Sequence, residues 1–238
     1  MLCYSESNIK LYNDSWENSI DKLFDKEKID LVLTSPPYNL GNNHHTRNVN
    51  TNAYYDDYPE EEYQEKQLFL LNKLYDMLSD TGSIIYNHKN RIKNGIQITP
   101  YEWILKSKFI VKQELVWVNG TPNFDKIRFY PATERLYWLS KTEKTQFYNV
   151  INNQDVFYWA SEKQDKFHTR SFPLSMAIDI IKCFPQSNII FDPYSGSGTT
   201  LLASKILNKR GYGIEISKKY CDIAISRLQK TGKMGRFL

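Results

Sequence analysis

The segment 34–38, Thr-Ser-Pro-Pro-Tyr, carries residue types that could act on the amino group of a nucleobase. That group is a poor nucleophile because its lone pair is delocalised into the ring, so a catalyst must accept hydrogen bonds from it. The Ser35 hydroxyl and the Pro36 carbonyl can accept them, while adjacent prolines fix φ and remove competing N–H donors. The Tyr38 ring can stack on a base turned out of a helix. The alternative is an ordinary strand-ending turn with a core aromatic.

A glycine-rich segment at 192–200, Asp-Pro-Tyr-Ser-Gly-Ser-Gly-Thr-Thr, could hold a ligand against the backbone. Gly196 and Gly198 lack side chains that would block the approach, and a helix is expected to begin at Thr199 or Thr200. The segment lacks the Lys-Ser/Thr ending of a P-loop and the third glycine of the dinucleotide fingerprint.

An acidic residue, Glu215, follows the glycine-rich segment at the sequence spacing that is typical of nucleotide-binding proteins. The short strand-like stretch 211–215 ends in Glu215, where a carboxylate that holds ribose hydroxyls belongs in a βαβ unit. The combination predicts a nucleotide-type ligand at the turn, and the alternative is a set of purely structural glycines.

Aliphatic runs at 29–33 and 188–191 precede the two motifs and read as buried parallel strands. Ligands bind at the carboxyl ends of such strands in open α/β sheets. Hydrophobic spacing predicts four further strands and four helices, together with a polar loop at 41–57 that can act as a lid. The strands are expected at 9–12, 83–86, 109–118 and 134–139, and the helices around 16–23, 60–78, 99–107 and 173–184.

Length and composition bound the function class. A chain of 238 residues suits one α/β catalytic domain, 1–238, with a small recognition insert, and its net charge of +4 permits a polyanionic partner without proving one. Three separated cysteines and the lack of a signal peptide or apolar span predict a reduced cytoplasmic protein with no membrane association. His44 and His45 have no matched carboxylate or cysteine nearby, so no metal site is expected. No Pro-Cys dipeptide offers the thiolate that methylation at a cytosine ring carbon would need.

The order of these motifs resembles the β-group of amino DNA methyltransferases, in which the Pro-Pro-Tyr motif precedes the S-adenosylmethionine motif. The long interval between Tyr38 and Asp192 leaves room for the target-recognition segment that this group places there, expected at 119–166. The resemblance implies a doubly wound, mostly parallel α/β sheet with a reversed edge hairpin, as in class I methyltransferases. It also implies direct methyl transfer from S-adenosylmethionine to the amino group of a flipped base in duplex DNA, without a covalent enzyme intermediate.

Several shorter matches extend the resemblance. Asn13-Asp14 is similar to an early Gly-Asp whose acid faces the cofactor adenine, and 55–63 is similar to the acidic aromatic stretch after the catalytic loop. The segment 168–174 resembles His-Pro-x-x-Phe-Pro at the methionine end of the cofactor, with Thr169 in place of proline. The resemblance implies that the following residues bind the cofactor: Asp14, Thr34, His168, Phe172, Asp192, Tyr194, Ser195, Gly196, Gly198, Thr199 and Glu215.

The catalytic residues implied are Ser35, Pro36, Pro37 and Tyr38. Asn and Arg make bidentate base contacts and Lys and Arg contact phosphate, which favours a further group of residues as DNA contacts. These are Asn39, Lys89, Arg91, Asn123, Lys126 and Arg128. For the run 89–93 the alternative is a solvated loop.

The identity of the base stays open. Ser35 and the Phe172-Pro173 pair resemble enzymes for the cytosine amino group, so N4 of cytosine is favoured over N6 of adenine. Methylation of RNA or of a protein glutamine, and a catalytically silent DNA-binding module, are more remote alternatives. Intact Ser35, Tyr38, Asp192 and Glu215 argue against the silent module. A restriction endonuclease as functional partner and a homodimer are further possibilities.

Overall fold

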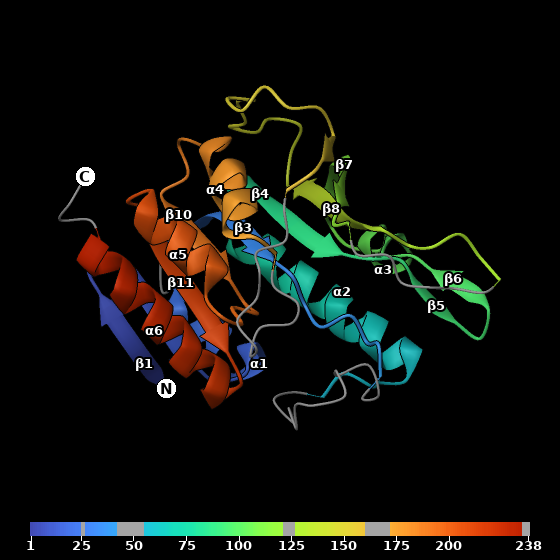
Figure 1. Cartoon of the computed structure of the whole chain (residues 1–238), viewed down its shortest axis with the longest axis horizontal. Coiled ribbons are helices and arrows are strands. Elements are labelled where there is room, and N and C mark those ends of the chain that lie inside the picture. Colours follow the sequence, from blue (N-terminus) through green and yellow to red (C-terminus); the bar gives the residue numbers. More distant parts are fainter. Residues whose placement is uncertain (25–26, 42–54, 121–126, 160–171, 235–238) are drawn as a thin grey trace.

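The computed structural model describes residues 1–24, 27–41, 55–120, 127–159 and 172–234, with the side chains of the last helix described up to residue 230. A single nine-stranded sheet dominates the described residues, in the order β1-β2-β11-β10-β3-β4-β8-β7-β9 (Figure 1). Its strands are β1 (Leu2–Glu6), β2 (Ile9–Asn13), β3 (Ile29–Thr34), β4 (Leu78–His88), β7 (Ile110–Val118), β8 (Thr133–Ser140), β9 (Val156–Phe157), β10 (Ile189–Asp192) and β11 (Arg210–Glu215).

The parallel strands β2, β11, β10, β3 and β4 form the middle of the sheet. In their register Glu215 lies opposite Asn13, Asp192 opposite Gly213, and Thr34 opposite Tyr86. Because all five strands run the same way, the residues that end them meet at one edge of the sheet. Both sequence motifs begin at this edge.

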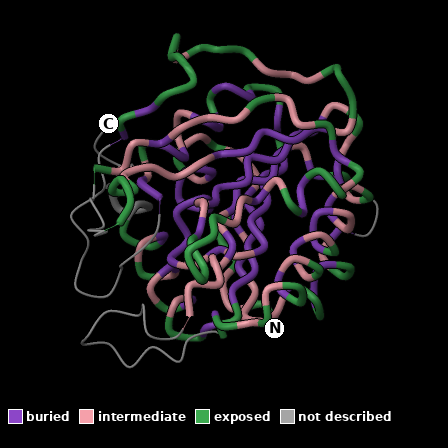
Figure 2. The backbone as a smooth tube through the Cα atoms, turned by 90° about the vertical axis from the view of Figure 1, so that its right-hand side faces the viewer, coloured by how far each residue is buried: buried purple, intermediate pink, exposed green. Residues whose placement is uncertain are grey.

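Successive side chains on β3 and β10 point alternately to the two faces of the sheet, and both faces are buried. Val32 and Phe191 pack in one core with helices α1 (Trp16–Leu23), α2 (Glu60–Met77) and α3 (Tyr101–Ile104). Leu31 and Ile190 pack in the opposite core with α4 (Leu174–Lys182), while α5 (Thr199–Ile206) packs against α6 (Lys218–Met234). The central strands are buried along most of their length (Figure 2). Such strands read in the sequence as nearly continuous apolar runs.

The sheet reverses direction at both edges. β8 is antiparallel to β4 and to β7, and β1 is antiparallel to β2. The predicted doubly wound, mostly parallel sheet with a reversed edge hairpin is therefore confirmed. No helix among the described residues is both long and apolar enough to cross a membrane.

The structure differs from the local predictions around Gly82. The strand expected at 83–86 is longer: β4 begins at Leu78, directly after α2 ends at Met77, so residues 80–82 belong to the strand and not to a turn after the helix. A Cβ at Gly82 would lie 2.6 Å from Leu78 Cγ and 3.1 Å from the Asp30 carbonyl oxygen. The glycine is thus required by the close approach of β4 and β3 and does not mark a helix end.

Two other segments also departed from expectation. The helix expected at 99–107 is the single turn α3, and the run 89–93, read as a loop, enters the hairpin β5 (Arg91–Lys93) and β6 (Ile96–Ile98). The edge strand β1 was not anticipated. Short elements of this kind carry too few residues for a clear hydrophobic period.

Candidate active site

A cavity of about 230 Å³ opens at the carboxyl edge of the parallel strands. Both motifs contribute to its wall, together with residues that precede α1 and α2. Of the residues predicted for the site, those that line it are Asp14, Ser35, Pro36, Pro37, Tyr38, Phe172, Asp192, Tyr194, Ser195, Gly196, Thr199 and Glu215. Segments far apart in the chain therefore converge on one cavity.

The glycine-rich turn is held by the carboxylate of Glu215. Gly196 has φ +50°, and its N–H donates to Glu215 Oε2 at 2.8 Å, while Oε1 accepts from the Ser217 N–H at 2.8 Å. A Cβ at Gly196 would meet nothing closer than the Tyr194 carbonyl oxygen at 3.9 Å, so the backbone is open to a ligand. Burial outweighs these hydrogen bonds and raises the pKa of Glu215 to about 7.

Ser195 supplies an unused polar atom in the same wall. Its Oγ is buried and has no hydrogen-bond partner among the described residues. A buried hydroxyl without a partner is costly, and this one lies against β11, where a Cβ at Gly213 would approach it to 2.6 Å. With the open backbone at Gly196 and the carboxylate of Glu215, the turn fits a ligand rich in hydroxyl and amino groups, as S-adenosylmethionine is.

Asp192 lines the cavity and also links neighbouring elements of the fold. It is 2% exposed and accepts hydrogen bonds from Thr34 Oγ1 at 2.7 Å and from Thr200 Oγ1 at 2.8 Å. Burial raises its pKa to about 6. The carboxyl group joins β3, β10 and α5, and its two oxygens are largely occupied in doing so. Thr34 uses its hydroxyl for the hydrogen bond to Asp192, and Thr34 itself does not line the cavity.

Gly198 was predicted to let a ligand approach, but the structure gives it another role. It precedes α5 with φ +78°, and a Cβ there would lie 2.8 Å from Ala224 Cβ on α6. This glycine is therefore needed for the packing of α5 on α6.

Asp14 lies at the junction of β2 and α1. Its Oδ1 accepts from the Ser15 N–H at 2.8 Å and its Oδ2 from Ser19 Oγ at 2.6 Å. These hydrogen bonds lower its pKa. The carboxylate thus stays charged at the edge of the cavity, and Ser15, the residue that precedes α1, makes no side-chain cap.

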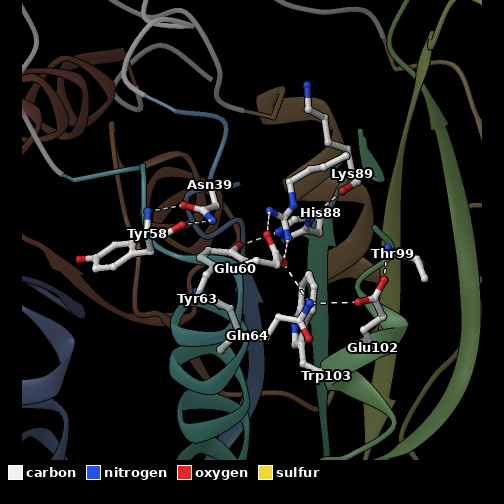
Figure 3. A network of polar contacts seen from close by, with 12 residues as sticks. Asn39, Tyr58, Glu60, Tyr63, Gln64, His88, Lys89, Thr99, Glu102 and Trp103 are labelled. Atoms are coloured by element: carbon white, nitrogen blue, oxygen red, sulfur yellow. Dashed lines mark hydrogen bonds and ion pairs between the residues drawn. The ribbon is translucent and has the colours of Figure 1, made fainter. Parts of the chain in front are cut away.

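The turn at residues 35–38 contacts a polar network that is drawn in Figure 3. Tyr63 Oη lies 2.6 Å from the Pro37 carbonyl oxygen and 2.7 Å from His88 Nε2. His88 Nδ1 lies 2.8 Å from the Lys89 carbonyl oxygen, and burial lowers the pKa of His88 to about 3, so the ring is neutral. The Tyr38 ring rests on the His88 ring, with centroids 4.5 Å apart.

Asn39 shapes the chain after the turn. Its side-chain Nδ2 donates to the Tyr58 carbonyl at 3.0 Å and its Oδ1 accepts from the Tyr58 N–H at 2.7 Å, as Figure 3 shows. Its backbone N–H donates to Asp56 Oδ1 at 2.6 Å. The amide expected to contact DNA is thus used within the protein.

Arg91 also lies elsewhere than expected. Its side chain is 3% exposed and makes two hydrogen bonds of 2.7 Å to Glu60. The guanidinium lies over the Tyr63 ring, 4.8 Å from its centroid. Arg91 is therefore part of the network behind the catalytic turn, and this corrects its assignment as a DNA contact.

The remaining predicted residues fall into two groups. Lys89 is half-buried after β4, and Arg128 is exposed before β8. His168, Asn123 and Lys126 lie outside the described residues, as do His44, His45 and most of the expected lid. Within the described part of the chain, no cluster of three or more His, Cys, Asp or Glu side chains could hold a metal ion.

Sequence reasoning missed four side chains of the site. Trp16 Nε1 donates to Tyr194 Oη at 2.8 Å, and Tyr63 supports the turn. Tyr38 Oη contacts Asn87 Oδ1 at 3.1 Å and Glu134 Oε2 at 2.9 Å. Asn87 and Glu134 lie near the end of β4 and the start of β8, which meet at the same edge because these strands are antiparallel. The sequence signal that could have found Asn87 and Glu134 is their position as polar residues at the ends of predicted strands.

Comparison with known proteins adds an independent finding. The N6_N4_Mtase family model, described as DNA methylase, matches residues 29–226. The type II methyltransferase M.ScaI of Streptomyces caespitosus is 26% identical, over 95% of this chain and 83% of its own length. The type II methyltransferase M.BglII of Bacillus subtilis is 24% identical, over 90% of this chain and 67% of its own.

Solved structures share the fold. The PvuII DNA methyltransferase, which is cytosine-N4-specific, matches with a TM-score of 0.77 and 19% identity, over 94% of this chain and 87% of that one. M1.HpyAVI in its S-adenosylmethionine complex matches with a TM-score of 0.64 and 22% identity, over 92% of this chain and 99% of that one.

Proposed function

Since this chain belongs to the family of N6- and N4-amino DNA methylases, and is thus an S-adenosylmethionine-dependent DNA methyltransferase, we propose that it methylates N4 of cytosine in duplex DNA. The observation that carries the choice of base is Ser35, whose hydroxyl stands in the cavity wall beside Tyr38. Serine at this position, and Phe172-Pro173 at the start of α4, resemble cytosine enzymes. The PvuII enzyme with the same fold is named as cytosine-N4-specific, which accords with this choice.

The residues of the catalytic turn polarise the target amino group. Ser35 Oγ and the Pro36 carbonyl accept its two hydrogens, which draws the nitrogen lone pair out of conjugation with the ring. The Tyr38 ring, fixed on its other side by His88, stacks on the flipped base. Catalysis then rests on positioning and on hydrogen bonds made to the amino group as it becomes nucleophilic.

The cofactor would be held by the opposite wall of the cavity. Glu215 would accept from its ribose hydroxyls, Asp14 would face its adenine, and Ser195 and the Gly196 backbone would contact its polar groups. When bound, the cofactor supplies a methyl group on a sulfonium. Phe172 and Tyr194 also line the cavity, and their rings would exclude water from the reacting groups.

Adenine N6 is the alternative target. Its amino group carries the same two hydrogens, so the acceptors of the turn serve it equally well. Nucleoside analysis of DNA treated with the protein and labelled cofactor decides between them. The expected product is N4-methylcytosine, N6-methyladenine would overturn the choice of base, and labelling of RNA or protein alone would overturn the role of the turn.

The proposal extends to the rest of the molecule. Within a single catalytic domain, 1–238, the segment 119–166 would read the target sequence, with Lys89 and the 126–128 stretch against the DNA backbone. The free cysteines among the described residues suit a reducing cytoplasm. A restriction endonuclease that cuts the same site and a homodimer remain part of this proposal.

A further inference from the structure

The hydroxyl of Tyr38 contacts three side chains although it has one proton. Ser35 Oγ lies 2.9 Å from Tyr38 Oη, Glu134 Oε2 lies 2.9 Å away, and Asn87 Oδ1 lies 3.1 Å away. A carboxylate oxygen and an amide oxygen can only accept hydrogen bonds from a phenol. The proton of Tyr38 therefore points toward Glu134 or Asn87.

The side-chain amide of Asn87 is held in one orientation, so it cannot present its NH₂ group to Tyr38 as a donor. Its Nδ2 donates to the Arg135 carbonyl oxygen at 3.0 Å, so its Oδ1 is the atom that faces Tyr38. Glu134 is the stronger of the two acceptors because hydrogen bonds to a carboxylate are charge-assisted, and its distance is the shorter. Its second oxygen accepts from Asn119 Nδ2 at 3.3 Å, which fixes the carboxylate at the root of segment 119–166.

Only one arrangement of Ser35 agrees with these contacts. Since the proton of Tyr38 is committed elsewhere, the bond between the two hydroxyls must be donated by Ser35. The lone pairs of Ser35 Oγ are then left for the cavity, and the hydroxyl acts there as an acceptor. This is the polarity that an amino group with two hydrogens requires.

We propose that Glu134 is a positioning residue for methyl transfer: by accepting the Tyr38 proton it makes Ser35 donate to Tyr38 and keeps Ser35 Oγ as an acceptor toward the target amino group. The proposal rests on the function of the turn proposed above and holds for cytosine or adenine. Asn87 assists as the second acceptor. Glu134 itself does not line the cavity.

Three variants test this role in steady-state methyl transfer to duplex DNA. Glu134→Ala should lower kcat roughly tenfold, with KM for cofactor and for DNA changed by less than about twofold. Glu134→Gln keeps an acceptor oxygen and should stay within about threefold of the parent. Glu114→Ala is the matched control and should leave kcat unchanged. Glu114 lies on the neighbouring strand β7, where its carboxylate is paired with Arg135 and makes no contact with residues 35–38 in the described part of the chain.

The decisive measurement is a double-mutant cycle with Tyr38→Phe, which keeps the ring and removes the hydroxyl. If Glu134 acts through that hydroxyl, Glu134→Ala should cause no further loss in the Tyr38→Phe background. Independent, multiplying losses would overturn the proposal, and so would an unchanged kcat in Glu134→Ala or a rise in KM for cofactor alone. Thermal unfolding and cofactor titration accompany each variant.

Two controls keep the outcomes distinct. If Glu134→Ala does not fold, Glu134→Lys replaces the acceptor with a donor of similar reach and is expected to lose activity where Glu134→Gln retains it; equal activity of these two would reject the role. A parent protein that methylates no DNA base overturns the proposed function itself, whereas a parent that does so with an additive cycle overturns only the role of Glu134.

Discussion

Two carboxyl groups of the cavity wall, Asp192 and Glu215, titrate far above their ordinary range because they are buried. For Glu215 the nearby negative charge of Asp192 adds to the effect. Sequence predicted both acids, but it could not show how their oxygens are used. The partner of Asp192 on β3, Thr34, is 158 residues away in the chain, and no local pattern links the two.

We expect the affinity for S-adenosylmethionine to rise with pH through about 7. The pKa of Glu215 is about 7 without ligand, and a ribose hydroxyl donates to the ionised form, so binding at lower pH must first expel a proton. Calorimetric titration between pH 6 and 8 measures this. Glu215→Gln should bind more weakly and show a flatter pH profile; a parent profile as flat as that of the variant would contradict the role of the carboxylate.

Asp192 should contribute to the pH dependence of folding with a sign opposite to that of an ordinary paired acid. Its pKa is raised from 3.8 to about 6, so the folded state binds the extra proton, and the free energy of unfolding falls as pH rises from 4 to 7. The loss amounts to roughly 3 kcal/mol at most. Urea unfolding of parent and Asp192→Asn across this range tests it: the variant should lack this part of the slope.

At the scale of elements, the long buried strands and amphipathic helices were predictable because each carries several residues of a clear period. β3, β10, α2 and α4 were found close to their expected bounds. The errors fell where a distant neighbour decides the conformation, as at Gly82, whose lack of a side chain is required by the Asp30 backbone on another strand. Arg91 is a second case, since its partner Glu60 belongs to a helix far earlier in the chain.

The two glycines of the turn before α5 should respond differently to alanine. Both have positive φ, which costs roughly 1–2 kcal/mol for a residue with a Cβ. At Gly198 the new Cβ also collides with Ala224, and overpacking adds about 1–3 kcal/mol. Chemical denaturation should therefore show Gly198→Ala to be the less stable variant. Gly196→Ala should instead lose mainly cofactor affinity, and equal stabilities would contradict the packing role of Gly198.

Arg91→Ala should destabilise the fold. Removing the Arg91 side chain leaves the carboxylate of Glu60 without its partner. Because Glu60 is 22% exposed, we expect a cost below the roughly 3–5 kcal/mol of a fully buried pair but above about 1 kcal/mol. Lys93→Ala, two residues along the same exposed hairpin, is the matched control and should change the unfolding free energy by less than about 0.5 kcal/mol. Near-parental stability of Arg91→Ala would show that the pair with Glu60 is not needed.

At the scale of the molecule, the order of strands could not be derived from local periodicity, because pairing joins segments from opposite ends of the chain. β2 pairs with β11, and that register alone places Asn13 beside Glu215. The order of the two motifs supplied the topology through the resemblance to a known group. Details such as the hydrogen bonds of Tyr38 required the three-dimensional arrangement.

The charge of the whole molecule leads to the last prediction. With a net charge of only +4, DNA affinity must come from basic residues gathered at one edge. Lys89 follows the carboxyl end of β4, and Arg128 precedes β8, whose start lies at the same edge as the cavity. Lys209 precedes β11 at the opposite edge and serves as the control.

Binding of duplex DNA should weaken as salt rises, because each neutralised phosphate releases counterions. Alanine at Lys89 or Arg128 should lower the slope of log K against log salt by about 1 each, whereas Lys209→Ala should leave it unchanged. Fluorescence anisotropy with a labelled duplex over 50–200 mM salt, roughly the range in which such contacts are resolved, measures the slope. An equal effect of Lys209→Ala would mean that DNA lies across another face, and a slope of zero in the parent would exclude phosphate contacts as the source of its affinity.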